Sequence, residues 1–331
     1  MSPTLDRSSD SPSRIDPAAH PYTSDFAGLM KSIKSAGLLR RRHGYYGVLA
    51  SILTVVLGMT VTGMIFLGSS WWSVALAPPL AIVLTQFAFL AHELAHKAVF
   101  ASGSSNDIWG RIIANLVVGI SYSWWMNKHS RHHANPNTVG KDPDIESDVV
   151  VFREDIAPTT TGLQRAIVKR QGWLFFPLLT LEGLNLHIQG FKSAFSRKKI
   201  EARGSEITML LSRHIILFGL VYWFMPWGVA SVFIVTQLAV FGVYMGASFA
   251  PNHKGMPIIG RDVKVDFLRR QVLTSRNITG GTAMDLAMGG LNYQIEHHLF
   301  PNMPRPALAK AAKMVKAYCL ERSITYTETS L

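Results

Sequence analysis

The chain has 331 residues, of which 48% are hydrophobic and only 16% are charged, and this composition excludes an ordinary soluble protein. A single cysteine excludes an internal disulfide and a thiolate zinc site. The formal net charge of +12 raises nucleic acid as a partner, so the positions of the cations have to be examined.

The first 38 residues are rich in Ser, Pro and Asp and have no apolar core, so we expect a disordered tail. They contain no signal-peptide-like apolar stretch. A single membrane domain is expected to occupy residues 39–331. Inside it, the segment from Tyr46 to His96 has no Lys or Arg. This segment is long enough for two membrane spans of about 20 residues each.

The first two predicted spans are residues 46–68 and 73–91, separated by the uncharged loop "SSWW". The segment from His214 to His253 also has no Lys or Arg, and it predicts two more spans, at 207–225 and 229–249. Apart from Arg213, which lies near the cytoplasmic end of the third span and can extend to the interface, the cations therefore flank the apolar stretches. By the positive-inside rule, both termini and the 97–206 connection are cytoplasmic, and the basic charge reflects topology rather than binding to nucleic acid.

The 97–206 connection carries two apolar patches, 112–125 and 173–186, which are short for spans and are interrupted by polar residues. We expect helices there that lie at the interface or pack under a cap, with Trp124 and Trp125 as interface anchors. The predicted fold class is an all-α integral membrane protein. It has four transmembrane helices in two hairpins and a cytoplasmic helical cap.

Eight of the twelve histidines stand in three short motifs and at one helix end, all on the cytoplasmic side of the predicted spans. They are His92 and His96 in "HELAH", His129, His132 and His133 in "HSRHH", His253 in "NHKG", and His297 and His298 in "QIEHH", which also contains Gln294. One such pair on a helix is ordinary, but four groups on one side of a membrane can converge. The pattern therefore predicts a metal site in the cap.

The number of candidate ligands indicates the kind of site. A catalytic zinc takes about three protein ligands, so eight imidazoles, with Gln294 as a weaker oxygen donor or water anchor, imply two metals. Imidazole binds iron, copper, nickel and zinc alike, so the residue types leave the metal open.

Charged residues accompany these motifs. Lys128 and Arg131 can receive the phosphates of a coenzyme A or lipid head group, or an acidic electron donor; the alternative is a plain basic membrane-facing surface. Four acids are either supports that orient ligand imidazoles or solvated charges: Glu93, Asp142, Asp144 and Glu296.

Two other functions compete for the same residues. "HELAH" matches the H-E-x-x-H motif of zinc proteases, with Glu93 as general base, but a protease leaves "HSRHH" and "QIEHH" unexplained. A metal transporter would place its ligands at the bilayer midplane, whereas these histidines lie outside the predicted spans.

The motifs H-x₃-H, H-x₂-HH and Q-x₂-HH, in this order, resemble those of the membrane fatty acid desaturase family. The resemblance covers nearly everything after residue 40, and "GGLNYQIEHHLFPNMPR" (289–305) is its most distinctive stretch. Many members begin the third motif with His, and Gln294 in that place is similar to the branch that contains the front-end desaturases. The family implies a non-haem di-iron centre ligated by these motifs.

The resemblance implies that O₂ is the co-substrate and that a double bond is introduced into a long fatty acyl chain, carried on coenzyme A or on a lipid. Related di-iron lipid hydroxylases share similar motifs, so hydroxylation stays open. The chemistry agrees, because no side-chain acid or base removes hydrogen from an unactivated methylene and an oxidant made from O₂ at a metal is needed.

Some desaturases carry a fused cytochrome domain. The N-terminal tail here is short for one and has no HPGG motif. The expected partners are therefore the acyl substrate, membrane lipid, and a separate ferredoxin-like or cytochrome electron donor with its reductase.

Overall fold

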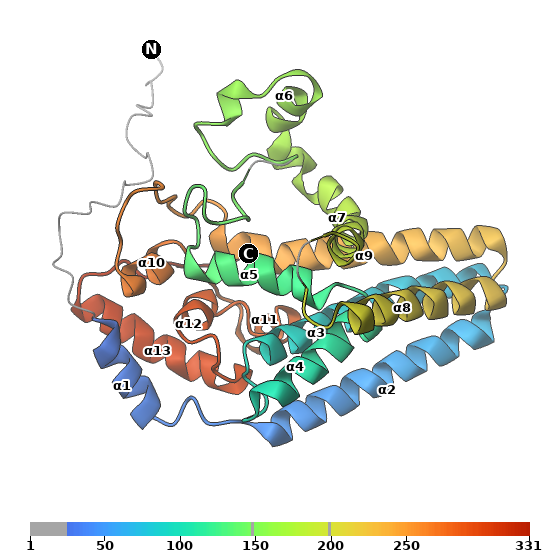
Figure 1. Cartoon of the computed structure of the whole chain (residues 1–331), viewed down its shortest axis with the longest axis horizontal. Helices are drawn as coiled ribbons and strands as arrows, with labels where there is room; N and C mark the ends of the chain where they lie inside the picture. Colours follow the sequence, from blue (N-terminus) through green and yellow to red (C-terminus); the bar gives the residue numbers. More distant parts are fainter. Residues whose placement is uncertain (1–24, 147–148, 198–199) are drawn as a thin grey trace, which may run out of the picture.

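The computed structural model describes residues 25–146, 149–197 and 200–331. Within these ranges the chain is mainly helical, and the helices form a bundle with a cap at one end (Figure 1). The short strands β1 (Asn277–Ile278) and β2 (Glu328–Thr329) pair in parallel. The expected all-helical class therefore needs only this small correction.

Four stretches are long and apolar enough to cross a membrane. They are α2 (His43–Leu67), the pair formed by the 3-10 helix η2 (Trp71–Leu76) and α3 (Ala77–Ala95), α8 (Arg203–Phe224) and α9 (Trp227–His253). These are the four predicted stretches, and all four extend a few residues further toward the cap than expected. Because α3 continues to Ala95 and α9 to His253, helices that begin deep in the bundle carry histidines into the cap.

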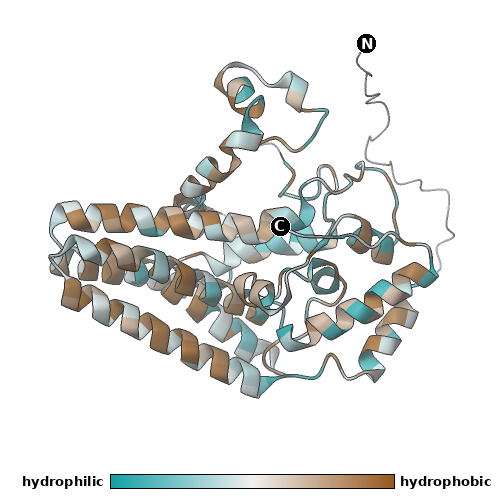
Figure 2. Cartoon of the chain, turned by 180° about the vertical axis from the view of Figure 1, so that it is seen from behind, coloured by the Kyte–Doolittle hydropathy of each residue, from teal (hydrophilic) through white to brown (hydrophobic). Residues whose placement is uncertain are grey.

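The four helices lie side by side, with α3 packed against α9 (Figure 1). One face of α2 is exposed and apolar, with Val48, Ile52, Val55 and Met59 spaced by three or four residues. Figure 2 shows the same apolar character along the bundle helices. In a membrane-spanning bundle such a face contacts lipid acyl chains, since none of the residues that the structure describes covers it.

Helix α7 (Gln171–Ala194) covers the expected patch at 173–186 and packs closely against α9. A Cβ atom added to Gly183 would fall far inside contact distance of the Leu238 carbonyl oxygen, and one on Gly242 would collide with that of Leu179. Glycine is therefore required at both positions. The motif "GVYMG", which ends at Gly246, allows the two helix backbones to touch.

The remaining helices form or adjoin the cap (Figure 1). They are α4 (Gly103–Arg111), the π-helix η3 (Ile112–Val118), α5 (Tyr122–Ala134), the 3-10 helix η4 (Ala157–Thr159), α6 (Gly162–Val168), α10 (Phe267–Leu273), α11 (Gly281–Ala287), α12 (Gln294–Leu299) and α13 (Arg305–Glu321).

The expected tail boundary at residue 38 is wrong. Residues 1–24 lie outside the described part of the chain, but Phe26–Ser35 form helix α1. Its Leu29 and Ile33 are buried against residues of α10, α12 and α13, and Phe26 stacks on Phe300 with ring centroids 5.5 Å apart. Helix α1 is thus part of the cap, and it packs against α13 (Figure 1).

Candidate metal centre

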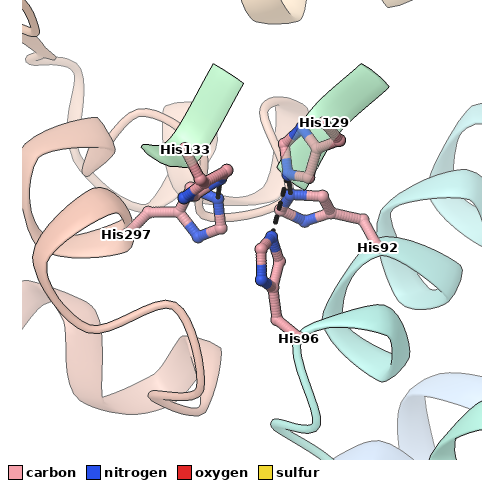
Figure 3. A group of neighbouring side chains, drawn as sticks. All are labelled: His92, His96, His129, His133 and His297. Carbon is pink, nitrogen blue, oxygen red and sulfur yellow. Dashed lines mark hydrogen bonds between the residues drawn. The ribbon is translucent and has the colours of Figure 1, made fainter. Parts of the chain in front are cut away.

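One group of five histidines comes from three helices that meet under the cap (Figure 3). Its members are His92 and His96 at the end of α3, His129 and His133 on α5, and His297 on α12. The Nε2 atom of His129 lies 3.0 Å from that of His92 and 2.8 Å from that of His96. His297 Nε2 lies 3.1 Å from His133 Nε2.

Helical spacing explains which histidines share this group. His92 and His96, like His129 and His133, stand four residues apart and so lie on one helix face. Helix α5 is capped by Ser121, the residue before its first turn, whose side chain accepts a hydrogen bond from the Trp124 amide. His132, next to His133 in the sequence, lies on a different face of α5 and points into a second group of histidines.

The second group consists of His132, His253 and His298. His132 Nε2 and His253 Nε2 lie 3.3 Å apart, and the His132 and His298 ring centroids are 5.0 Å apart. Gln294 Nε2 lies 2.9 Å from His253 Nε2, so the carboxamide also faces this group. The structure thus brings all eight predicted histidines and Gln294 into two adjoining groups.

In the second group, the Nδ1 nitrogens, which point away from the interior of the group, are held by hydrogen bonds. His132 Nδ1 donates to Asp142, 3.0 Å away, and His253 Nδ1 donates to the Thr274 carbonyl, also 3.0 Å away. His298 Nδ1 donates to Gln271 Oε1 over 2.9 Å. A hydrogen on Nδ1 leaves the lone pair on Nε2, so all three rings present an acceptor nitrogen to the interior of the group.

Burial keeps most of these rings neutral. It lowers the pKa of His96 to about 3, and it holds the pKa values of His129, His133, His297 and His298 well below the usual histidine value, with neighbouring imidazoles lowering them further. Neutral imidazole is the form that ligates a metal.

The donor set fits metal ions. His129 Nε2 carries either one hydrogen or one lone pair, so it cannot hydrogen-bond well to both of its neighbours. Among the described residues the buried His298 Nε2 has no hydrogen-bond partner. Nitrogens that share one ion at about 2.0–2.1 Å must lie roughly 3 Å from one another, as they do here.

Two acids and a lysine support the second group. Asp142 is buried beneath His132, and Asp144 Oδ2 lies 3.4 Å from His132 Nδ1. Burial opposes the charged form of Asp144, but the Lys128 ammonium 2.8 Å away holds the pKa of that carboxyl below its usual value. Lys128 is therefore engaged by Asp144. Arg131 is exposed, and among the described residues its hydrogen-bond partner is the Lys141 carbonyl, at 3.4 Å.

Glu93 does not orient an imidazole, which corrects one expectation. Its carboxylate receives Arg305 Nη2 at 2.5 Å and the Tyr46 hydroxyl at 2.8 Å. This buried pair joins α3 and α2 to the start of α13. Because Glu93 is engaged in this way, it is not placed to serve as the general base of a zinc protease.

Glu296 is likewise buried away from the imidazole nitrogens. Its carboxylate accepts hydrogen bonds from Asn277 Nδ2 at 2.7 Å and from the Tyr326 hydroxyl at 2.8 Å. Burial raises the pKa of Glu296 to about 7. The carboxyl fixes α12 to β1 and the C-terminal segment, so its expected role as an imidazole support is also corrected.

Sequence reasoning missed Gln271 on α10. Besides accepting from His298, its Nε2 donates to the His133 carbonyl over 3.0 Å, so it links two of the motifs. Gln271 belongs to none of the histidine motifs, and no spacing signals its role. Trp125 was misplaced, because its ring stacks on His129 with centroids 4.3 Å apart instead of anchoring an interface.

A mainly apolar cavity of about 30 Å³ opens beside His92 and Trp125. Its other lining residues include Phe89, Val118, Met245 and Phe249, from α3, η3 and α9. This apolar lining beside the His92 imidazole suits an alkyl group rather than a polar ligand.

Residues 69–330 match the family described as "Fatty acid desaturase", and this range contains every residue of both histidine groups. The chain is 26% identical over 330 residues to a Delta(8)-fatty-acid desaturase of Helianthus annuus, covering 92% of this chain and 69% of the relative. It is 28% identical to a Delta(6)-fatty-acid desaturase of Caenorhabditis elegans, covering 91% of this chain and 70% of that one.

A third relative, an Acyl-lipid (9-3)-desaturase of Physcomitrium patens, is 31% identical over 267 residues. The alignment covers 76% of this chain and 49% of the moss protein. The chain thus spans between about half and about seven tenths of the length of these relatives.

Proposed function

The chain belongs to the fatty acid desaturase family, and from that premise we propose that its two histidine groups hold two non-haem irons at which O₂ oxidises a long fatty acyl chain. The chain is an oxidoreductase of the desaturase class, acting on fatty acyl substrates. The proposal adds the two irons, their ligands and the use of O₂.

The proposal rests on the way one helix, α5, divides eight histidines, six of them buried and two half-buried, into two groups. His129 and His133 of α5 face the first group, and His132, between them, faces the second. A single ion cannot use eight imidazoles, whereas two ions can. The first ion would be held by the five-histidine group, and the second by His132, His253 and His298 with Gln294 beside them.

Bound iron would supply, with O₂ and two electrons, the oxidant that removes two hydrogens from unactivated methylenes. The protein's own residues bind and orient the substrate. Phe89, Met245 and Phe249 line the apolar cavity and exclude water from an inserted alkyl chain. Trp125 is stacked on His129 and borders both the cavity and the first histidine group. The fatty acyl chain would therefore reach the metal centre beside Trp125.

Gln294 acts as a hydrogen-bond donor in this proposal. Asn252 Nδ2 donates to the carbonyls of Ser248 and Leu291 and to Gln294 Oε1, at 3.1–3.2 Å. With its oxygen engaged there, Gln294 presents its amide hydrogens to the second group. It would therefore hold a water or other oxygen at the second iron rather than ligate the ion through its own oxygen.

The remaining supports have distinct proposed roles. Asp142, Asp144, Thr274 and Gln271 orient ligand rings through their outer nitrogens. Exposed Arg131 is the better candidate to meet a phosphate of the acyl carrier or an acidic electron donor, because Lys128 is paired with Asp144.

We further propose that the four apolar helices form two hairpins, with both termini and the cap in the cytoplasm and the electrons supplied by a separate ferredoxin-like or cytochrome donor with its reductase. The support is the charge distribution, since each of the two long segments without Lys or Arg falls on a pair of these helices. Tags near residue 160 and at the C-terminus should report the cytoplasmic side, and a tag in "SSWW" the opposite side. A C-terminal tag on the far side would refute the arrangement.

The function is tested by expressing the chain in cells and analysing their fatty acids by gas chromatography, with metal analysis of the purified protein. We expect new unsaturated acyl chains and two irons per chain. A variant with His132→Ala, His253→Ala and His298→Ala should retain about one iron and produce nothing. Hydroxylated products would assign the chain to the related hydroxylases, and one zinc per chain would overturn the di-iron proposal.

A further inference from the structure

Helix α7 has an apolar face that nothing in the described chain covers. Trp173 is 90% exposed, Phe176 60% and Leu181 61%, and the exposed Leu184 and Ile188 continue the stripe at helical spacing. Helix α7 is not one of the four helices long and apolar enough to span a membrane. An exposed apolar stripe of this length indicates a surface that contacts another apolar phase.

The depth at which α7 meets α9 can be worked out from α9 itself. A hydrocarbon core of about 30 Å takes about 20 helical residues. Counted from the exposed Trp227 at the far end of α9, that length ends near Gly246. On α7, Gly183 meets Leu238 inside the cap-side half of this core, whereas Leu179 meets Gly242 and Gly246, close to the boundary between acyl chains and head groups. The part of α7 that precedes Leu179 therefore lies at the membrane surface.

The segment just before the stripe is basic. Arg165, Lys169 and Arg170 are all exposed, and residues 161–181 contain no acidic residue. None of these three cations pairs with an acid in the part of the chain that the structure describes. On the short helix α6, Leu163 is also 77% exposed. Cations next to exposed Trp, Phe and Leu are the composition of a segment that binds a lipid surface.

We propose that α6 and the first half of α7, residues 162–181, form a membrane-contact arm that lies on the cap-side lipid monolayer and selects anionic lipids. Trp173, Phe176 and Leu163 insert among the acyl chains. Arg165, Lys169 and Arg170 meet the phosphates of anionic head groups. Figures 1 and 2 show this arm extending beyond α9, away from the other helices.

Charge favours lipid over a second copy of the chain as the occupant. Two copies that met through this arm would bring six cations together without a compensating acid from the arm, since 161–181 contains none. An anionic monolayer compensates the same cations.

The arm is tested on the full-length protein reconstituted into phosphatidylcholine vesicles with and without phosphatidylglycerol. Trp173→Cys is labelled with a nitroxide, and Lys313→Cys on the exposed face of α13 serves as the matched control. The native Cys319 is buried and does not compete for the label. Accessibility is compared between O₂, which concentrates in acyl chains, and a water-soluble nickel chelate.

We expect the ratio of accessibility to O₂ over accessibility to the chelate to be several-fold higher for the label at position 173 than for the control label. The difference should be largest in the vesicles with phosphatidylglycerol. Replacing Arg165, Lys169 and Arg170 by Gln should remove the added effect of that lipid. A label that is equally accessible to the chelate at both positions would overturn the proposal. Protection of the label from both reagents would also overturn the proposal, because it indicates a protein contact. An O₂ preference that is identical in the two kinds of vesicle would overturn the selection of anionic lipid.

Discussion

The buried pair between Glu93 and Arg305 is the clearest target for mutation. Arg305 Nη2 lies 2.5 Å from Glu93 Oε2, its Nε lies 3.3 Å from Oε1, and the two side chains are only 7% and 10% exposed. Glu93→Gln keeps the shape and an acceptor for the Tyr46 hydroxyl, but it leaves the guanidinium buried without its counter-charge. Breaking a buried pair from one side costs about 3–5 kcal/mol.

That loss should lower the midpoint of thermal unfolding in detergent by on the order of 10 °C. Since the pair joins the helix that carries His92 and His96 to the helix that follows His297, the iron content should fall with stability. Glu321→Gln, which removes a 71% exposed acid from α13, is the matched control and should leave the midpoint unchanged.

A double variant, Glu93→Gln with Arg305→Met, removes both charges and should recover part of the lost stability, because no unpaired ion is left in the interior. The reasoning would be refuted if Glu93→Gln unfolded at the wild-type temperature, or if the double variant were no more stable than the single one. Loss of all activity at full stability would instead point to a direct chemical role for Glu93.

Three further predictions concern the centre and its supports. Gln271→Leu removes the acceptor for His298 Nδ1, so metal analysis should find the iron content reduced toward one per chain, while Gln271→Glu keeps an acceptor and should retain more iron. Gln294→Ala should keep most of the iron yet lose most turnover, and Gln294→His should retain some; wild-type turnover in the Ala variant would remove Gln294 from the site. Phe26→Ala should lower the unfolding midpoint through the lost contact with Phe300, whereas Lys31→Ala on the exposed face of α1 should not.

The sequence alone determined the features that depend on neighbours along the chain. The four apolar stretches follow from composition, because about 20 consecutive apolar residues suffice to cross a bilayer. The grouping of His92 with His96 follows from the helical repeat, which places residues four apart on one face. The same repeat separates His132 from His129 and His133, but it does not tell which group His132 joins.

Short helices escaped prediction. Helix α1 has only 10 residues, and its burial depends on α10, α12 and α13, which lie more than 200 residues away in the sequence. A helix of this length is marginal without tertiary packing, so its local signal is weak.

Only the tertiary structure decided the partners of the charged and polar groups. Glu93 stands beside His92 in the sequence, yet on the helix it projects to another side and meets Arg305, 212 residues later. Gln271 reaches His298 for a similar reason, because α10 packs against α12. Spacing along one helix fixes the direction of a side chain, but the group it meets depends on which distant segment packs there, and that is settled by burial of the whole cap.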